Sequence, residues 1–455
     1  MIGVYYNLLY LSESVIKLIN MTSKEQVEEQ WLSSKIIPEI VKSGKLLDDG
    51  LPLIDFKLIS IEIKFIGNDE AFMLTTCYKA KIKFELNENV HGTRTLVVKK
   101  TPEIPEEMFN DINFSTLFSN EIYGYITIIP AILNFTKRKF NVPRYYYGDL
   151  QKCSATIVLE DFNSSGWQMS KERFNLSLEH ALLAVKYLAN FHGICFALKH
   201  MEHEHFKILT EALKESRYAT PSLHPDWTHT LKTSIKRVVT VTQRYHPEVP
   251  MEFLNKLQNL ISDNYRYGKQ RVQPVEPMAT LCHGDFLRNN VAYKYEEGTD
   301  RPVDIMMFDL QTMRYSSPMV DLSVFLALSI FKDVRAKHFD EIFNTYCEKL
   351  ASTYMEHTQQ QLPDHLSRDS LQKEYVLFLP YSIGVAASFL MALVEPDKMS
   401  SEELLCMQRT LEEIEKDVMH RGGEIVNREL AHQVKEMYDF SLNYKVDICE
   451  GIDLK

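Results

Sequence analysis

The chain has 455 residues, of which 45% are hydrophobic and 25% are charged, and its formal net charge is -11. This apolar content is enough to bury a large core, which excludes a disordered chain. The acidic excess argues against nucleic acid as a main partner, because phosphate backbones are bound by basic surfaces. Nucleotides are still allowed, because a few local cations and a metal ion can hold them.

Residues 1–21 are expected to form an N-terminal extension. They are apolar and aromatic, but Asn7, Glu13 and Lys17 interrupt the apolar run, which makes it too short and too polar to span a bilayer. No other segment approaches transmembrane length in the sequence pattern, so we expect no membrane span. The seven cysteines are scattered without a CxxC pair, which predicts neither a disulfide framework nor a zinc site and favours a cytoplasmic location.

A small strand-rich region follows. Residues 22–43 have apolar positions at helical spacing, and the region from 53 to 100 changes to a strand pattern. Three strands, at 59–66, 77–84 and 95–99, are separated by glycine-containing turns. This arrangement is typical of an antiparallel sheet.

Most of the remaining chain is predicted to be helical. A helix is expected at 106–133 and a further strand at 155–160, followed by a polar loop. Strongly periodic helical stretches then follow at 177–199, 319–355 and 371–440. A short strand-rich island at 280–312 interrupts them.

This island carries the densest chemistry of the chain. His283-Gly284-Asp285 is followed by Asn290, and Asp309 ends the next apolar strand. Phosphoryl transfer from ATP needs a carboxylate that orients or deprotonates the attacking hydroxyl, oxygen ligands for Mg²⁺, and a cation on the phosphates. Asp285, Asn290 and Asp309 meet the first two needs, because Mg²⁺ prefers oxygen and usually takes only one or two protein carboxylates. The ordered set, rather than the His-Gly-Asp triplet alone, predicts a site.

A His-Gly-Asp-x-x-x-x-Asn motif followed by a hydrophobic-Asp-hydrophobic strand resembles the aminoglycoside phosphotransferase and choline kinase group. The closer resemblance is to its ecdysteroid-kinase-like (CHK kinase-like) branch, over about residues 30–400. It is carried by the segments HGDFLRNNVAYKY, MMFDLQTMRYSSPMVDLSVFL, IVLEDF and YLANFHGICFAL. The resemblance implies an α+β, two-lobed protein-kinase-like fold. Its antiparallel-sheet N-lobe would span 22–160 and bind the nucleotide, and its large, mostly helical C-lobe would span 161–455.

The resemblance also implies roles for single residues. Asp285 corresponds to the catalytic aspartate, and Asn290 and Asp309 correspond to the metal ligands. Lys99 corresponds to the lysine that binds the phosphates, and Glu121 to the helix glutamate that pairs with this lysine.

Two further positions follow from the same resemblance. Leu159 and Glu160 fall at the hinge, where backbone groups of the family meet adenine. Asp321 is expected to anchor the catalytic loop rather than to react.

The predicted activity is therefore ATP- and Mg²⁺-dependent transfer of the γ-phosphoryl group to a hydroxyl of a small molecule. The resemblance favours an ecdysteroid-like steroid as the acceptor. A detoxifying kinase of foreign alcohols or glycosides is an alternative. A protein kinase is disfavoured, because the sequence has no GxGxxG loop and no HRD, DFG or APE motif.

The stretch expected to cover the phosphates, residues 66–72, departs from the usual pattern. It has one glycine and the two acids Asp69 and Glu70, whereas phosphate cradles normally use free backbone amides with little side-chain charge. A catalytically inactive kinase-like binding protein is therefore a further alternative. Lys100 leaves the identity of the phosphate lysine open by one position, because strand alternation turns only one of two neighbours toward the cleft.

Three other polar residues have simpler interpretations. His283 is expected to hold the loop, and His192 to lie in the core, because it is on an apolar helix face. Contact of Arg288 with phosphate is the less favoured hypothesis for that residue. Aromatic residues between about 205 and 275 form a hypothetical lining for the acceptor pocket.

Overall fold

The computed structural model describes residues 24–47, 56–67, 74–86, 90–219 and 225–453. The expected extension at 1–21 and the acidic positions 69 and 70 lie outside the described residues. The chain divides into two compact units. The sheet unit contains the described residues within 24–67, 74–102 and 144–165, and the helical unit contains the described residues within 103–143 and 166–453.

The sheet unit is built on a five-stranded antiparallel sheet with the strand order β1-β2-β3-β5-β4. Its strands are β1 (Lys57–Phe65), β2 (Thr76–Leu86), β3 (Val90–Lys100), β4 (Tyr145–Gln151) and β5 (Ser154–Glu160). The predicted antiparallel sheet and the α+β class are thus confirmed. The edge strand β4 was not predicted, and β3 begins earlier than the apolar pattern indicates.

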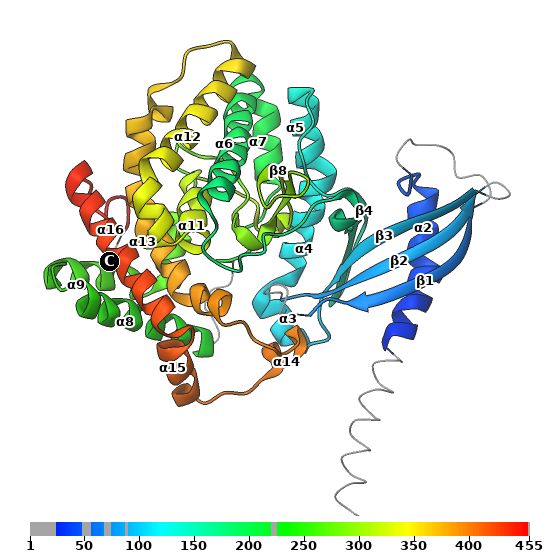
Figure 1. Ribbon diagram of the computed structural model, residues 1–455, viewed down its shortest axis with the longest axis horizontal. Coiled ribbons are helices and arrows are strands. Elements are labelled where there is room, and N and C mark those ends of the chain that lie inside the picture. The colour runs from blue at the N-terminus through cyan, green and yellow to red at the C-terminus, as the bar shows by residue number, and fades with distance from the viewer. Residues whose placement is uncertain (1–23, 48–55, 68–73, 87–89, 220–224, 454–455) are drawn as a thin grey trace, which may run out of the picture. The chain divides into compact units, whose positions relative to one another are not determined.

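One face of this sheet is covered by a helix, as Figure 1 shows for α2 and strands β1 to β3. Helical residues 24–31 lead through the π-helical turn η1 (Leu32–Ile36) into α2 (Ile37–Lys42). Four alternating residues of β2 are buried against it: Tyr78, Ala80, Ile82 and Phe84. The residues between them, Lys79, Lys81 and Lys83, lie on the opposite face because neighbours in a strand point to opposite sides.

The helical unit contains most of the helices. They are α3 (Glu106–Ile112), α4 (Phe114–Tyr123), the π-helical turn η2 (Gly124–Ile128), α5 (Ile129–Thr136), α6 (Leu178–Met201), α7 (His203–Glu211), α8 (Pro225–Tyr245), α9 (Met251–Ile261), α10 (Asn264–Arg271), α11 (Met319–Ser329), α12 (Lys332–Thr358), α13 (Arg368–Val394), α14 (Ser401–Cys406), α15 (Leu411–His420) and α16 (Gly423–Tyr444). In the core of this unit α6 packs along α12, α11 against α13, and α8 against α16.

The single helix predicted at 106–133 is wrong in detail. Asn113 adopts a left-handed conformation with a φ of 63°, which separates α3 from α4. The turn η2 then separates α4 from α5. Asparagine tolerates the left-handed region better than most residues, so Asn113 is the local signal for the break.

The strand-rich island forms two short antiparallel pairs within the helical unit. β6 (Thr280–Cys282) pairs with β9 (Arg314–Ser316), and β7 (Val291–Tyr295) pairs with β8 (Pro302–Met307). Two 3₁₀ turns complete it, η4 (Arg288–Asn290) and η5 (Leu310–Thr312). The predicted site residues Asp285, Asn290 and Asp309 therefore lie in the short turns that connect these strands.

The prediction that no other segment approaches transmembrane length is wrong for two helices. By length and hydropathy α6 and α13 are long and apolar enough to cross a membrane, but 72% and 78% of their most apolar windows are buried inside the protein. This burial is typical of core helices. All seven cysteines lie in the described part of the chain and are free thiols.

Candidate functional site

The Asp285 carboxylate, in the loop between β6 and η4, is held from two sides. Asn290 Nδ2 donates to Asp285 Oδ2 at 3.0 Å and to its carbonyl oxygen at 2.8 Å. Arg217 Nη2 lies 3.1 Å from Asp285 Oδ1. The Asp285 side chain is still 23% exposed, and these two contacts fix the orientation of its carboxylate.

His283 connects this loop to the end of β8. Its Nε2 donates to the carbonyl of Phe308 at 2.9 Å, and its Nδ1 accepts the backbone amide of Asp285 at 3.3 Å. The amide of Phe308 donates in turn to the carbonyl of Asn290 at 3.0 Å. The predicted loop-holding role of His283 is confirmed, and the contacts bring Asp285, Asn290 and the end of β8 together.

Asp309 lies two residues after β8 and has a left-handed backbone with a φ of 63°. Its Oδ2 accepts a hydrogen bond from Gln311 Nε2 at 3.3 Å. The side-chain nitrogen of Asn290 is committed to Asp285, so the side-chain oxygen of Asn290 is the atom that would bind a metal ion. One amide oxygen and one carboxylate are hard oxygen ligands of the kind that Mg²⁺ prefers, so these two residues fit the predicted ion.

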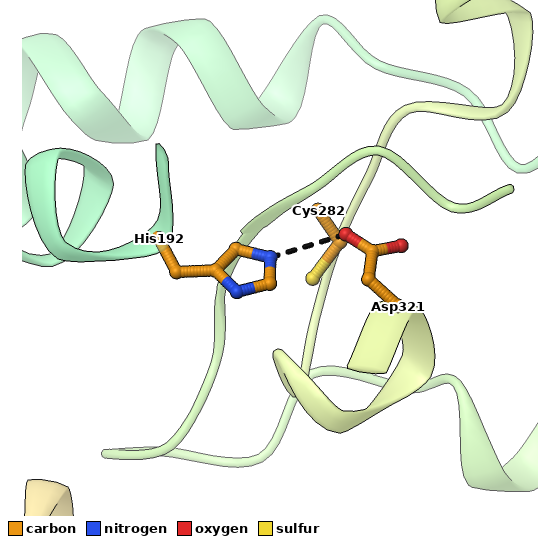
Figure 2. Close-up of side chains that lie close together, drawn as sticks. All are labelled: His192, Cys282 and Asp321. Carbon is orange, nitrogen blue, oxygen red and sulfur yellow. Dashed lines mark hydrogen bonds and ion pairs between the residues drawn. The ribbon is translucent and has the colours of Figure 1, made fainter. Parts of the chain in front are cut away.

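The backbone of the loop is anchored by Asp321 on α11. This carboxylate is fully buried and accepts the amides of His283 and Gly284, each at 2.7 Å. Figure 2 shows His192 Nε2 of α6 directed at Asp321, with 3.1 Å between Nε2 and Oδ2. Burial alone raises the pKa of Asp321, but the hydrogen bond from His192, the electrostatic interactions with His192 and His283, and the hydrogen bond from the Gly284 amide hold it below its usual value. Asp321 is therefore an ionised anchor.

His192, Cys282 and Asp321 place their possible ligand atoms within 4.8 Å of one another, a spacing that could suit a metal ion (Figure 2). The protein already engages each of them. Tyr346 Oη is 2.7 Å from His192 Nδ1, and Cys282 Sγ donates to the carbonyls of 316–317. Burial raises the pKa of Cys282 well above its usual value, so it is a neutral thiol rather than the thiolate that binds metal. The predicted core position of His192 is confirmed, and the cluster is a hydrogen-bonded support for the loop.

Glu121 is also positioned beside the end of β8. It is a buried residue of α4, and α4 packs against η5, the turn that follows Asp309. Burial raises the pKa of Tyr125 well above its usual value, and the negative charges of Glu121 and Asp309 raise it further. The two carboxylates therefore act on the same buried tyrosine.

Lys99 and Lys100 of the sheet unit are distinguished by their faces. Lys100 Nζ lies 2.5 Å from Glu28 Oε1 and 4.4 Å from the centre of the Trp31 ring, on the helix-covered face. Strand alternation turns Lys99 to the opposite face, where it is 8% exposed. This favours Lys99 as the phosphate-binding lysine. Its pairing with Glu121, which would join the two units, stays a prediction.

The predicted hinge residues Leu159 and Glu160 are the last two residues of β5. Leu159 is buried, and the amide of Glu160 donates to the carbonyl of Arg144 at 2.8 Å. The Glu160 carboxylate accepts the amide of Arg144 at 3.3 Å. Glu160 thus links β5 to the residue before β4, and its contact with adenine stays a prediction.

One arginine agrees with the favoured expectation, and a second was not predicted. Arg288 is 7% exposed, and it donates to the carbonyls of Glu172 and Ser170 at 2.6 and 2.7 Å, so it supports the loop structurally. Arg217 was missed, although it contacts Asp285. No local motif marks it, because its partner is 68 positions away in the chain.

The sequence model of the ecdysteroid kinase-like family matches residues 69–360. Among curated proteins, no sequence matches the chain.

Three solved structures are similar at low sequence identity. The GDP complex of an aminoglycoside 2'-phosphotransferase IIIa variant is 12% identical, with a TM-score of 0.36, over 88% of this chain and 99% of the other. ADP-bound aminoglycoside phosphotransferase APH(2'')-Ib is 13% identical, with a TM-score of 0.29, over 89% and 99%. The gentamicin complex of APH(2'')-IIa is 14% identical, with a TM-score of 0.29, over 76% and 92%.

Proposed function

Because the chain belongs to the ecdysteroid kinase-like family, we propose that it transfers the γ-phosphoryl group of ATP to a hydroxyl of an ecdysteroid-like steroid. The family assignment confirms the resemblance in the sequence, and it makes the chain a kinase-like phosphotransferase of small molecules. The steroid acceptor, the use of Mg-ATP and a cytoplasmic location are our proposals.

The observation that carries the proposal is the connected set of Asp285, Asn290 and Asp309. Hydrogen bonds through His283 and Phe308 hold these residues on two neighbouring turns. Asp285 would orient the acceptor hydroxyl and receive its proton, while Asn290 and Asp309 would hold Mg²⁺. The ion would neutralise charge on the nucleotide phosphates.

The sheet unit would supply the nucleotide contacts. Lys99 would neutralise phosphate charge and would be fixed by Glu121, and backbone groups at Leu159 and Glu160 would meet adenine. The position of Lys99 on the face opposite Lys100, whose ammonium group pairs with Glu28, supports this assignment.

The test is a transfer assay with purified protein, radiolabelled Mg-ATP and separate ecdysteroid, choline, aminoglycoside and plant-glycoside acceptors. We expect a labelled ecdysteroid product, and we expect Asp285→Asn to lower its rate by about 100-fold or more, in the range of lost acid–base catalysis. Transfer only to glycosides or foreign alcohols would favour the detoxifying kinase. No transfer to any acceptor, or an unchanged rate for Asp285→Asn, would contradict the proposed reaction.

An inactive binding protein makes a different prediction. It has no need of a metal-dependent nucleotide site, so Mg-ATP should not raise its melting temperature. For the proposed kinase we expect stabilisation by ATP that grows when Mg²⁺ is added and weakens in Asp309→Asn.

A further inference from the structure

The segment 215–218, which follows α7, lies directly against the catalytic loop. Arg217 Nη2 is 3.1 Å from Asp285 Oδ1, and each of the two side chains is 23% exposed. Asn290 Nδ2 binds the other carboxylate oxygen at 3.0 Å. Each oxygen of Asp285 therefore has its own donor, and rotation of the carboxylate would break both contacts.

The backbone at Arg217 is itself fixed by Glu215. Glu215 Oε1 accepts the amides of Arg217 and Tyr218 at 2.8 and 3.0 Å. Its second oxygen accepts Arg314 Nη1 at 3.2 Å. Arg314 lies on β9 opposite Cys282, the residue before the His-Gly-Asp triplet. Two ion pairs, Arg217 with Asp285 and Glu215 with Arg314, thus join this segment to both sides of the catalytic loop.

Tyr218 holds the segment from the opposite side. It is 7% exposed, and its ring lies 5.4 Å from that of Tyr265, centre to centre. A Cβ at Gly268 on α10 would lie only 2.3 Å from the Tyr218 hydroxyl, so this close approach needs glycine. The backbone at Arg217 is consequently held by a buried neighbour.

The Arg217 guanidinium has a second partner on α13. Its Nη1 lies 3.4 Å from the hydroxyl of Tyr381. Burial alone lowers the pKa of Arg217, but Tyr381 and Asp285 raise it above its usual value, so the cation is retained. The guanidinium of Arg217 is planar and permanently charged, and it lies between Tyr381 and Asp285. It therefore restricts the direction in which the Asp285 carboxylate points.

We propose that Arg217 is a positioning residue that keeps Asp285 directed toward the acceptor hydroxyl, an inference that rests on the proposed phosphoryl transfer. In that step the acceptor O–H bond breaks as its oxygen bonds to the γ-phosphorus, the bond from this phosphorus to the leaving ADP breaks, and Asp285 receives the proton. An exposed ion pair contributes little to stability. Arg217 differs because it is partly buried, held at its backbone and paired with the reacting carboxylate.

The experiment compares Arg217→Gln and Arg217→Lys with Arg421→Gln as a matched control. Arg421 forms a partly buried ion pair with Asp397 at 2.8 Å, and that pair involves neither the catalytic loop nor the segment 215–218. For Arg217→Gln we expect kcat to fall about 10- to 100-fold, the effect of a misplaced catalytic group, with the ATP KM unchanged. Arg217→Lys should recover part of the loss because it keeps the charge, and Arg421→Gln should keep the wild-type kcat.

Combination with Asp285→Asn tests whether Arg217 acts through Asp285. In that background Arg217→Gln should leave the residual kcat unchanged. A wild-type kcat for Arg217→Gln, or a kcat that merely follows the melting temperature across the three arginine variants, would overturn the positioning role.

A readout without turnover separates this inference from the proposed function. If wild-type protein transfers no phosphate, the proposed function fails. The melting temperatures of Arg217→Gln, Asp285→Asn and the double variant still test the contact. Non-additive shifts would support the coupling of the two residues, and additive shifts would overturn it.

Discussion

The backbone amide of Gly284 donates to Oδ1 of Asp321 at 2.7 Å, which ties the middle of the catalytic loop to α11. The second oxygen of Asp321 accepts the amide of His283 at the same distance. These two amides directly precede Asp285. The position of the proposed catalytic carboxylate therefore depends on a buried residue that is not itself a reacting group.

The Asp321→Asn substitution should weaken both the fold and the activity. One accepting oxygen becomes an NH₂ group that faces a donor, so a buried amide loses its partner at a cost of about 3 kcal/mol. We expect a lower midpoint in urea unfolding and a lower kcat. Asp340→Asn is the control, because Asp340 is 81% exposed in its ion pair with Arg368. Equal effects of the two substitutions would contradict the anchoring role.

The Gly284→Ala substitution should displace the loop. Gly284 has a φ of 84°, and a Cβ there would lie 1.9 Å from the backbone carbonyl oxygen of Thr312, which cannot simply rotate away. Gly298→Ala is a matched control, since Gly298 has a φ of 74° but no atom within 4 Å of such a Cβ. Left-handed strain alone costs about 1–2 kcal/mol.

We therefore expect Gly298→Ala to lose about that much unfolding free energy and to keep its activity. Gly284→Ala should lose more stability and most of its phosphoryl transfer. Circular dichroism during urea unfolding and the transfer assay measure the two effects. Similar losses in both variants would show that the contact with Thr312 is relieved without consequence.

Substitutions of Lys99 and Lys100 should have different effects, because we expect Lys99 to bind the nucleotide and Lys100 to stabilise the fold. Lys100→Met removes a partner of Glu28, which also accepts the Tyr78 hydroxyl at 2.6 Å, so we expect a loss of about 1–3 kcal/mol in stability. Lys99→Met should instead abolish the rise in melting temperature that Mg-ATP produces. Thermal unfolding of both variants, with and without Mg-ATP, makes the comparison. Loss of the nucleotide effect in Lys100→Met alone would reverse the assignment.

These lysines illustrate what the sequence can and cannot predict. Alternation along β3 predicts that only one lysine faces each side, but the choice depends on Glu28, which lies 72 positions from Lys100. The motif from His283 to Asn290, with Asp309, was found because it is compact and its spacing follows from the chemistry. Local periodicity likewise located the sheet and the long helices.

Contacts between distant segments set the remainder of the site. The apolar helix face around His192 predicts burial, but its partner Asp321 comes 129 positions later. Arg217 lies in a region interpreted from its aromatic residues, and its polar contact with Asp285 leaves no periodic signal. Helix breaks at single residues such as Asn113 are also weak signals, because the flanking sequence on both sides still favours helix.

Acid sensitivity should arise in the helical unit from His432 on α16. Its Nδ1 lies 2.6 Å from His246 Nε2. Burial lowers the pKa of His432 from 6.5 to about 4, and the positive charges of Lys332 and His246 add to this effect. The negative charge of Glu429 opposes it. The unfolded chain therefore binds a proton at this position before the folded chain does. The stabilising contribution is complete above about pH 6.5 and is lost as the pH falls toward about 4.

His432→Gln, which cannot be protonated, should flatten the decline of unfolding free energy between these two pH values. His338→Gln is the control, because His338 on α12 contacts Glu341 rather than a second histidine. Urea unfolding curves at a series of pH values measure the slopes. The neighbouring charged residues Glu248 and Arg335 are the same in wild type and in both variants. If wild type and His432→Gln had the same dependence of unfolding free energy on pH, the acid sensitivity would belong to other groups.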